Sequence, residues 1–323
     1  MRIRGDFTIK WVIACALIAS AQIAVGKPIG IVTILEGKAT VIRGLSEFDP
    51  VEGVRLNADD LVKTDKDTFL RIEYEDETWL ELGPETVLQL SHPADKKGKR
   101  PGLYLMSGWL KIGCGKPHAG AAPALAAVGM DIVDLSGVIV LRAREESHEI
   151  FAEAGAARWI DRMPHGSAPV SLNNNFLVVA HGRPPTVQGR PTSDFTSALP
   201  RAYRDTLPFR YSLFAARAVA VKDERTFSYA EVEPWLDAEP TVRRQFLVLW
   251  RRKAYDPAFR ASLDHDLNMH PEWDPILHPE KYEVTPPTQT PATITNHAPV
   301  AAPVPQTASP IKNNTGISLR GAN

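Results

Sequence analysis

Cysteine is nearly absent from this 323-residue sequence, which contains only two, and long apolar runs and a large net charge are also missing. Two cysteines exclude a disulfide-rich scaffold and a four-cysteine zinc site. The 37 basic residues balance 38 acidic ones, which excludes the broad cationic surface of a dedicated nucleic-acid-binding protein. No apolar run reaches the roughly 18–20 residues of a transmembrane helix, so a polytopic membrane protein is also excluded.

The first 26 residues have the pattern of a signal peptide. Three basic residues lie within the first ten, and the uncharged apolar segment 11–25 follows and leads to Gly26. We expect cleavage after Gly26, no membrane span after cleavage, and a periplasmic or secreted protein that starts at Lys27. An uncleaved inner-membrane anchor is the alternative, which the short apolar run disfavours. Lipidation at Cys15 is rejected because the apolar stretch before it is too short.

Residues 27–182 are predicted to form an all-β domain. In the run 69–75, Leu70 and Ile72 share one face while Arg71 and Glu73 share the other, and this period of two is typical of a strand. The same alternation recurs in further apolar pairs: Leu80/Leu82, Leu88/Leu90, Leu103/Leu105 and Leu110/Ile112. Glycine and aspartate turns separate the runs, and no helix-length pattern interrupts them. A sandwich, barrel or solenoid is therefore expected rather than alternating strands and helices.

Two segments of this domain are expected to be loops. The Ala/Gly-rich segment 115–128 lacks a strand pattern. A basic group is interpreted as a solvated hairpin tip, and it consists of Lys96, Lys97, Lys99 and Arg100.

Residues 29–112 resemble the FecR domain. The resemblance rests on the order of these motifs: GIVTILEGKATVIRG (30–44), GVRL (53–56), DDLVKT (59–64), FLRI (69–72), WLELGPETVLQL (79–90) and YLMSGWL (104–110), with fainter similarity at 137–142 and 149–155. FecR-like domains are exported β-rich modules, described as β-solenoid-like. In the namesake regulators they receive a signal from an outer-membrane transducer and pass it to a cytoplasmic sigma factor.

The sequence departs from those regulators at its start. They carry a cytoplasmic anti-sigma region ahead of one membrane helix, whereas ten residues precede the apolar run here. The resemblance therefore implies an exported FecR-type module and does not imply sigma-factor binding. Its glycines and the pair Asp59/Asp60 are interpreted as turn residues, because glycine adopts positive φ and an aspartate side chain accepts from backbone N–H groups.

The rest of the chain is expected to differ from the β-domain. Residues 183–194, rich in proline and glycine, suggest a linker, and 195–283 are predicted to be mainly helical. The fold class is thus α+β multidomain, with an all-β domain followed by a small helical region. The tail 284–323 has seven prolines and no aromatic or acidic residue, and we expect it to be disordered.

Three helix signals stand out in the segment 195–283. Ser228 and Glu231 fit a capping box, and Pro234 limits the helix that follows. Asp256 before a proline predicts an N-cap of a helix that Pro271 ends. Phe259, Leu263 and Leu267 would face inward on it.

A basic amphipathic helix is predicted over 242–253. Its inward residues are Val242, Phe246, Leu249 and Trp250, and its basic residues are Arg243, Arg244, Arg251, Arg252 and Lys253. We interpret the basic cluster as a solvated face, with an anionic phospholipid, polysaccharide or acidic protein as the alternative contact.

The residues able to do chemistry form no recognisable active site. Six candidate metal ligands lie in one short segment: Asp264, His265, Asp266, His270, Glu272 and Asp274. Asp266 and His270 are spaced to share a helix face, but no third ligand is fixed by spacing, so a structural role is favoured.

Three further patterns are rejected as sites. Residues 113–116 lack the spacing of a phosphate-binding loop, Cys114 with His118 has no fixed geometry, and Ser167 is not in a nucleophile elbow. Cys114, the only thiol after cleavage, is interpreted as a passive small residue, with an intermolecular disulfide as the alternative. We expect no catalytic, cofactor or metal residues and no cofactor.

Two classes of function remain. The first is a non-enzymatic, exported FecR-like interaction module that binds an envelope protein or polysaccharide. The alternative is an envelope hydrolase or metal-dependent enzyme with its site in the helical half. The first is preferred because no residue pattern in the sequence reaches the standard of an active site, and the second stays open as the alternative.

Overall fold

The computed structural model describes residues 28–92, 102–115, 124–163, 166–217 and 219–282. Within these ranges, none of the helices combines the length and the apolar character needed to cross a membrane.

Three sequence-based predictions lie outside the described residues. They are the signal peptide at 1–26, the basic hairpin tip at 96–100 and the disordered tail at 284–323.

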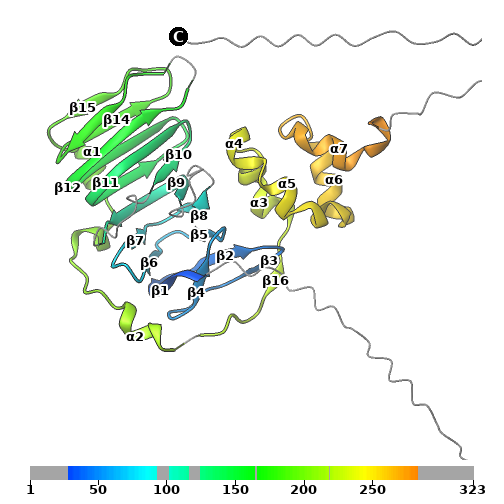
Figure 1. The fold of residues 1–323 in the computed structure, drawn as a ribbon, viewed down its shortest axis with the longest axis horizontal. Coiled ribbons are helices and arrows are strands. Elements are labelled where there is room, and N and C mark those ends of the chain that lie inside the picture. The colour runs from blue at the N-terminus through cyan, green and yellow to red at the C-terminus, as the bar shows by residue number, and fades with distance from the viewer. Residues whose placement is uncertain (1–27, 93–101, 116–123, 164–165, 218, 283–323) are drawn as a thin grey trace, which may run out of the picture. The chain divides into compact units, whose positions relative to one another are not determined.

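The described chain is β-rich, and its sixteen strands join into one sheet (Figure 1). The pairings between named strands are antiparallel, except that β9 and β10 run parallel. The strands are β1 (Pro28–Glu36), β2 (Ala39–Arg43), β3 (Ser46–Phe48), β4 (Arg55–Asn57), β5 (Leu61–Thr64), β6 (Phe69–Glu73), β7 (Trp79–Leu82), β8 (Val87–His92), β9 (Gly102–Gly113), β10 (Leu125–Ala127), β11 (Met130–Ala143), β12 (Ser147–Asp161), β13 (Val170–Asn173), β14 (Phe176–Ala180), β15 (Thr186–Gln188) and β16 (Arg225–Thr226).

The long strand β9 connects two arms of this sheet. Its first half pairs with β8, which continues through β5 to β2, and its second half pairs with β7, which continues through β6 to β1. Between the halves lies Gly108 with φ of +94°, where a Cβ atom would come within 2.4 Å of the Thr86 Cα. Only glycine fits this conformation and this close approach, so Gly108 allows one strand to serve both arms.

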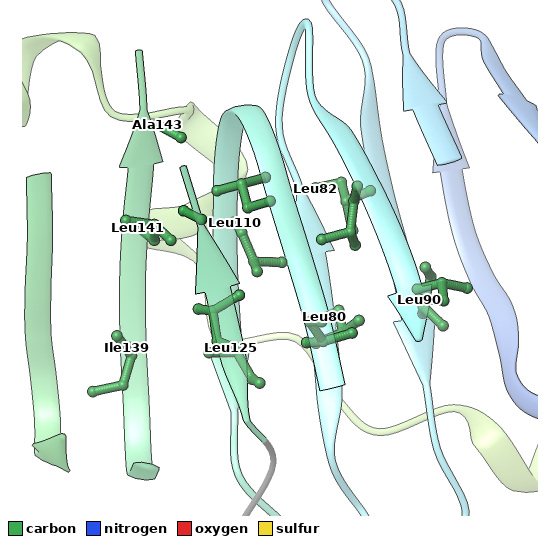
Figure 2. Packing of buried hydrophobic residues seen from close by; sticks show 14 of the residues in the cluster. Leu80, Leu82, Leu90, Leu110, Leu125, Ile139, Leu141 and Ala143 are labelled. Atoms are coloured by element: carbon green, nitrogen blue, oxygen red, sulfur yellow. The ribbon is translucent and has the colours of Figure 1, made fainter. Parts of the chain in front are cut away.

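The inward side chains of both arms form one apolar core. All four of the apolar pairs predicted by alternation, and the pair Leu70/Ile72, are buried in it, which confirms those strand assignments. Figure 2 shows part of this core, with labelled residues from β7, β8, β9, β10 and β11 whose side chains gather in the same layer. The strands therefore follow the predicted period of two on their inward side.

Two segments expected to lack strands contain short ones. Residues 125–127, within the expected loop 115–128, form β10 between β9 and β11. Residues 186–188, within the expected linker 183–194, form β15 on β14. Both strands are three residues long, too short for alternation to be recognised, and neighbouring strands of the sheet supply their hydrogen-bond partners.

The region beyond residue 192 is mainly helical, and its helices are short. They are α1 (Ser193–Ala198), η1 (Arg201–Arg204), α2 (Tyr211–Ala215), α3 (Tyr229–Leu236), α4 (Pro240–Arg243), α5 (Phe246–Leu249), η2 (Arg251–Tyr255), α6 (Pro257–His265), η3 (Pro271–Trp273), α7 (Asp274–Leu277) and η4 (Pro279–Lys281), where η denotes a 3-10 helix.

These helices share apolar cores with the sheet. Phe195 of α1 and Tyr203 of η1 pack with Trp109 of β9 in one cluster. Helices α3 to α7 pack in another cluster that includes Ile42 of β2 and Tyr104 of β9. The helical region therefore covers apolar side chains of the β-domain.

The capping predictions are confirmed. The Glu231 carboxylate accepts from the Ser228 backbone N–H at 2.5 Å, and α3 extends only two residues beyond Pro234. The Asp256 side chain accepts from the backbone N–H of Ala258 at 3.0 Å and caps α6.

Helix α6 ends at His265, six residues before Pro271. The prediction that Pro271 ends this helix is therefore wrong, and Pro271 instead begins the 3-10 helix η3. Proline is tolerated at the first position of a helix because the N–H group of that position has no hydrogen-bond partner within the helix.

The single helix predicted over 242–253 is also wrong. The segment consists of α4, α5 and η2, and the Val248 N–H binds the carbonyl of Gln245, three residues earlier, where the chain tightens. The Gln245 side chain exchanges hydrogen bonds of 2.8 and 3.0 Å with Gln89 of β8. These hydrogen bonds attach the chain to the sheet between α4 and α5. The partner residue lies far away in the sequence, so the periodicity within 242–253 does not reveal this contact.

Candidate functional site

Asp266 and His270, whose spacing suits one helix face, do not lie together on a helix. Helix α6 ends at His265, before Asp266 and His270. The His270 ring is fully buried, with Nδ1 3.3 Å from Asp237 Oδ1 and Nε2 3.1 Å from the Leu263 carbonyl oxygen. It thus holds α6 to the end of α3.

The remaining members of this segment have other partners. Asp264 pairs with His278 at 2.7 Å, Glu272 with Arg243 at 2.9 Å, and Asp274 with Lys281 at 2.9 Å. Within the described ranges, no three His, Cys, Asp or Glu side chains gather closely enough to hold a metal ion.

Of the patterns rejected as sites, Cys114 and Ser167 lie in the described part of the chain, and both make structural contacts. Cys114 is half-buried against the main apolar core. The Ser167 backbone N–H donates to the Asp161 carboxylate at 2.9 Å. His118 and Lys116 lie outside the described residues.

An unexpected charged cluster lies on the outer faces of β6, β7 and β9. Arg71, predicted on the face opposite Leu70 and Ile72, is buried, and its guanidinium contacts Glu73 at 2.7 Å and Glu81 at 2.5 Å. Lys111 lies on β9 opposite Glu81 and pairs with Glu153 at 2.9 Å. Burial raises the pKa of the Glu81 carboxyl, while Arg71 and Lys111 oppose the rise.

This cluster is buried because residues 199–217, here called the strap, cover it. The Tyr203 hydroxyl lies 2.7 Å from the Glu81 carbonyl oxygen, and Lys111 Nζ donates to the Tyr203 carbonyl oxygen at 2.6 Å. Further along, the Arg210 backbone N–H donates to the Glu73 carboxylate at 2.7 Å. The cluster therefore anchors the strap. No local signal reveals this, because its partners are more than 90 residues away in sequence.

The strap presents an exposed apolar patch. Leu213 is 68% exposed, Phe209 is 39% exposed and Val51, on the β-domain, is 53% exposed. The ion pair between Arg210 and Glu52, 3.5 Å apart, links the strap to the loop that carries Val51. We call Val51, Phe209 and Leu213, with this ion pair, the strap patch.

The segment α4–α5–η2 separates its basic residues into two groups. Lys253, expected at the surface, is buried; its Nζ donates to the Phe227 carbonyl oxygen at 2.5 Å and lies 4.4 Å from that residue's ring centroid. Arg243 is bound to Glu272. A second group is exposed, and with two apolar neighbours it forms the basic face: Arg244, Val248, Arg251, Arg252 and Tyr255.

A small cavity of about 110 Å³ lies between the sheet and α3. Its apolar lining includes Leu61 and Trp235, and Glu47 and Glu231 supply carboxyl groups. Glu47 is buried, and one of its oxygens accepts from Arg225 Nε at 2.8 Å. Burial and the nearby Glu231 carboxylate raise the pKa of Glu47. The cavity is thus partly polar and partly apolar.

The expected turn role of Asp60 is confirmed. Its carboxylate accepts from the Asn57 backbone N–H at 2.8 Å and pairs with Arg43 at 2.6 Å. The preceding Asp59 adopts a φ of +69°.

Comparison with protein-family models and with curated proteins finds no match. Two crystal structures of a candidate anti-sigma factor from Parabacteroides distasonis are similar to part of the fold. They are 14% identical in sequence, with TM-scores of 0.36 and 0.35. The aligned region covers 43% of this chain and 63% and 64% of theirs, so the chain spans less than two thirds of those proteins. These values carry no conclusion about function, and the FecR resemblance stays a prediction.

Proposed function

We propose that this chain is an exported, non-enzymatic FecR-like interaction module that binds another protein of the cell envelope through the strap patch. The observation that carries the proposal is the exposure of Leu213, Phe209 and Val51 on two segments that the Arg210–Glu52 ion pair joins. Clustered exposed apolar side chains bordered by charges are typical of protein–protein contact surfaces.

The location of the patch also supports this function. The strap is bound from beneath by Glu73, Lys111 and the carbonyl groups of β7 and β9. A partner therefore meets a surface that is already ordered, and ordering it costs little on binding.

The proposal gives no catalytic role to the acidic and histidine residues of the helical half. His270 and its neighbours Asp264, Glu272 and Asp274 are engaged in contacts that join one short helix to another. These contacts account for the side chains by packing and charge pairing alone.

Site-specific photocrosslinking in intact cell envelopes tests the proposal. A photoreactive residue in place of Leu213 is expected to form a discrete protein adduct. The matched control is Val187 on β15, an exposed apolar residue outside the patch, where no such adduct is expected. The Val51→Asp variant should weaken the Leu213 adduct. Equal labelling at both positions, or attachment only to polysaccharide, would contradict the proposal.

The alternative of a metal-dependent enzyme has a separate test. His265 is 85% exposed and can be replaced without disturbing the core. One zinc ion per purified chain that disappears in His265→Ala would overturn the non-enzymatic proposal.

A further inference from the structure

The basic face has a regular geometry although its helix is broken. Arg244, Val248, Arg251 and Tyr255 recur at spacings of three or four residues, and all four are exposed. The buried residues of the segment are Val242, Phe246, Trp250, Lys253 and Ala254. The segment is therefore amphipathic, with one side in the core and the other in solvent.

Most of the charge on the outward side lacks an ion-pair partner. No acidic residue occurs between positions 240 and 255. Among the described residues, neither Arg251 nor Arg252 takes part in an ion pair, and the only carboxylate near Arg244 is that of Glu272, at 3.9 Å. The face thus has a local positive potential on a protein whose formal net charge is −1.

Apolar side chains lie among these arginines. Val248 is 82% exposed and Tyr255 is 76% exposed, the two highest values among the large apolar residues that the structure describes. A tyrosine and an aliphatic residue next to arginines are the combination found where proteins meet the headgroup region of a bilayer.

The face is rigidly supported from behind. The Trp250 ring stacks on Phe246 with centroids 4.1 Å apart, and its Nε1 donates to the Gly44 carbonyl oxygen at 3.1 Å. Lys253 holds the next turn through Thr226 and Phe227. The outward side chains therefore need no folding step before they contact a surface.

We propose that the basic face docks the protein on an anionic phospholipid surface. The arginines contact the phosphate groups, and Val248 and Tyr255 enter the boundary between headgroups and acyl chains. A soluble polyanion could pair with the arginine charges but would not bury the exposed Val248 side chain. A phospholipid surface does both, and is therefore favoured. The basic face is separate from the strap patch, so this proposal does not depend on the proposed function.

Co-sedimentation of the full chain with vesicles tests the docking. One set contains only phosphatidylcholine, and the other is an equimolar mixture with phosphatidylglycerol. We expect binding to the anionic vesicles that weakens with added salt. Arg251→Glu with Arg252→Glu should lower it more than tenfold, because each arginine contributes ~5-fold near a charged bilayer. Val248→Ser with Tyr255→Ser should also lower it, because the apolar contribution is lost.

The matched control carries the same change of charge elsewhere. Arg183 and Arg190 are exposed and lie outside the basic face, and their double replacement by glutamate should leave binding essentially unchanged. The variants do not differ from one another in residues 1–26, so the comparison isolates the face. Equal binding to both vesicle types, or equal loss in the control, would overturn the proposal. The proposal would also be overturned if the Arg251→Glu, Arg252→Glu variant lost binding to a soluble polyanion such as polyaspartate but kept its binding to anionic vesicles.

Discussion

Lys253 shows how a basic residue contributes to the core of this protein. Its Nζ donates to Thr226 Oγ1 at 2.8 Å and to the Phe227 carbonyl oxygen at 2.5 Å, and it lies 5.2 Å from the Phe259 ring centroid. A buried ammonium group is tolerated only where such partners replace water. Lys253 thereby links the segment before α3 to η2 and α6.

We predict that Lys253→Ala destabilises the protein by about 2 kcal/mol, because a buried carbonyl loses its donor and two rings lose a packing partner. Lys253→Met keeps the stem and should cost less. The exposed neighbour Arg252→Ala is the control and should change stability by less than about 0.5 kcal/mol. Urea denaturation measures all three, and equal effects of Lys253→Ala and Arg252→Ala would contradict this role.

The Glu47 carboxyl predicts a pH dependence of stability. Burial, and then Glu231, raise its pKa above the usual 4.5, while Arg225 opposes the rise. Above pH 4.5 the unfolded chain loses this proton first, so the contribution of Glu47 to stability falls as pH rises toward the folded-state pKa. Glu47→Gln cannot titrate, and its stability relative to the wild type should increase with pH over this interval. Denaturation at a series of pH values measures the difference, and a difference that decreases would contradict the prediction.

At the scale of elements, the strap buries the outer face of β6 and β7. Both faces of β6 are buried, the inner one by Leu70 and Ile72 and the outer one by the strap. Tyr203 is central to this cover, because it packs against Trp109 and Phe69 and its hydroxyl contacts backbone carbonyl oxygens of β7 and β9.

We predict that Tyr203→Ala destabilises the protein by roughly 3–5 kcal/mol, the range for removing a buried aromatic ring. Tyr203→Phe removes only the hydroxyl and should cost about 1 kcal/mol. Leu213→Ala, on the same strap but exposed, should stay within about 0.5 kcal/mol. The three can be compared by chemical denaturation. A small effect of Tyr203→Ala would mean that the strap contributes little to stability.

Elements with local signals were predictable from the sequence. The alternation of Leu80 and Leu82 identified a strand, and the caps Ser228 and Asp256 identified the starts of α3 and α6. Each of these signals depends only on residues a few positions apart in the sequence, and the predicted strand and caps are present in the structure.

Features that depend on distant partners were not predictable. The sequence pattern separated Arg71 from Leu70 and Ile72 but did not predict its burial, because nothing near it reveals a strap more than 120 residues later. The burial of Lys253 likewise depends on the carbonyl of Phe227, from a separate segment. Of the candidate surfaces, the basic cluster was recognised, but two of its five predicted residues, Arg243 and Lys253, are engaged by other parts of the protein. The strap patch was missed because its residues come from two segments that are distant in sequence.

At the scale of the whole described chain, helices and sheet share their apolar clusters. The apolar cluster around α3 to α7 includes Ile42, Leu61 and Tyr104 of the sheet, and the cluster around α1 includes Phe176. A chain that ends at residue 182 would expose these side chains to water.

We therefore predict that a chain ending at residue 182 lacks a cooperative thermal transition, whereas one ending at 282 keeps the full-length melting temperature within error. Differential scanning calorimetry compares the two. A sharp transition in the shorter chain would show that the β-domain is stable alone. A drop of several degrees in the longer one would show that the tail docks on the rest.

The strap also has a consequence for the order in which the protein is made. The hydrogen bond from Tyr203 to Glu81 spans 122 positions, and that from Trp250 to Gly44 spans 206. A ribosome therefore releases β6 and β7 long before their cover exists. During that interval the nascent sheet presents unpaired edges and hydrated charges, a state prone to association with other chains. Such non-local closure is slow, so the emerging chain stays vulnerable until nearly all of it has been synthesised.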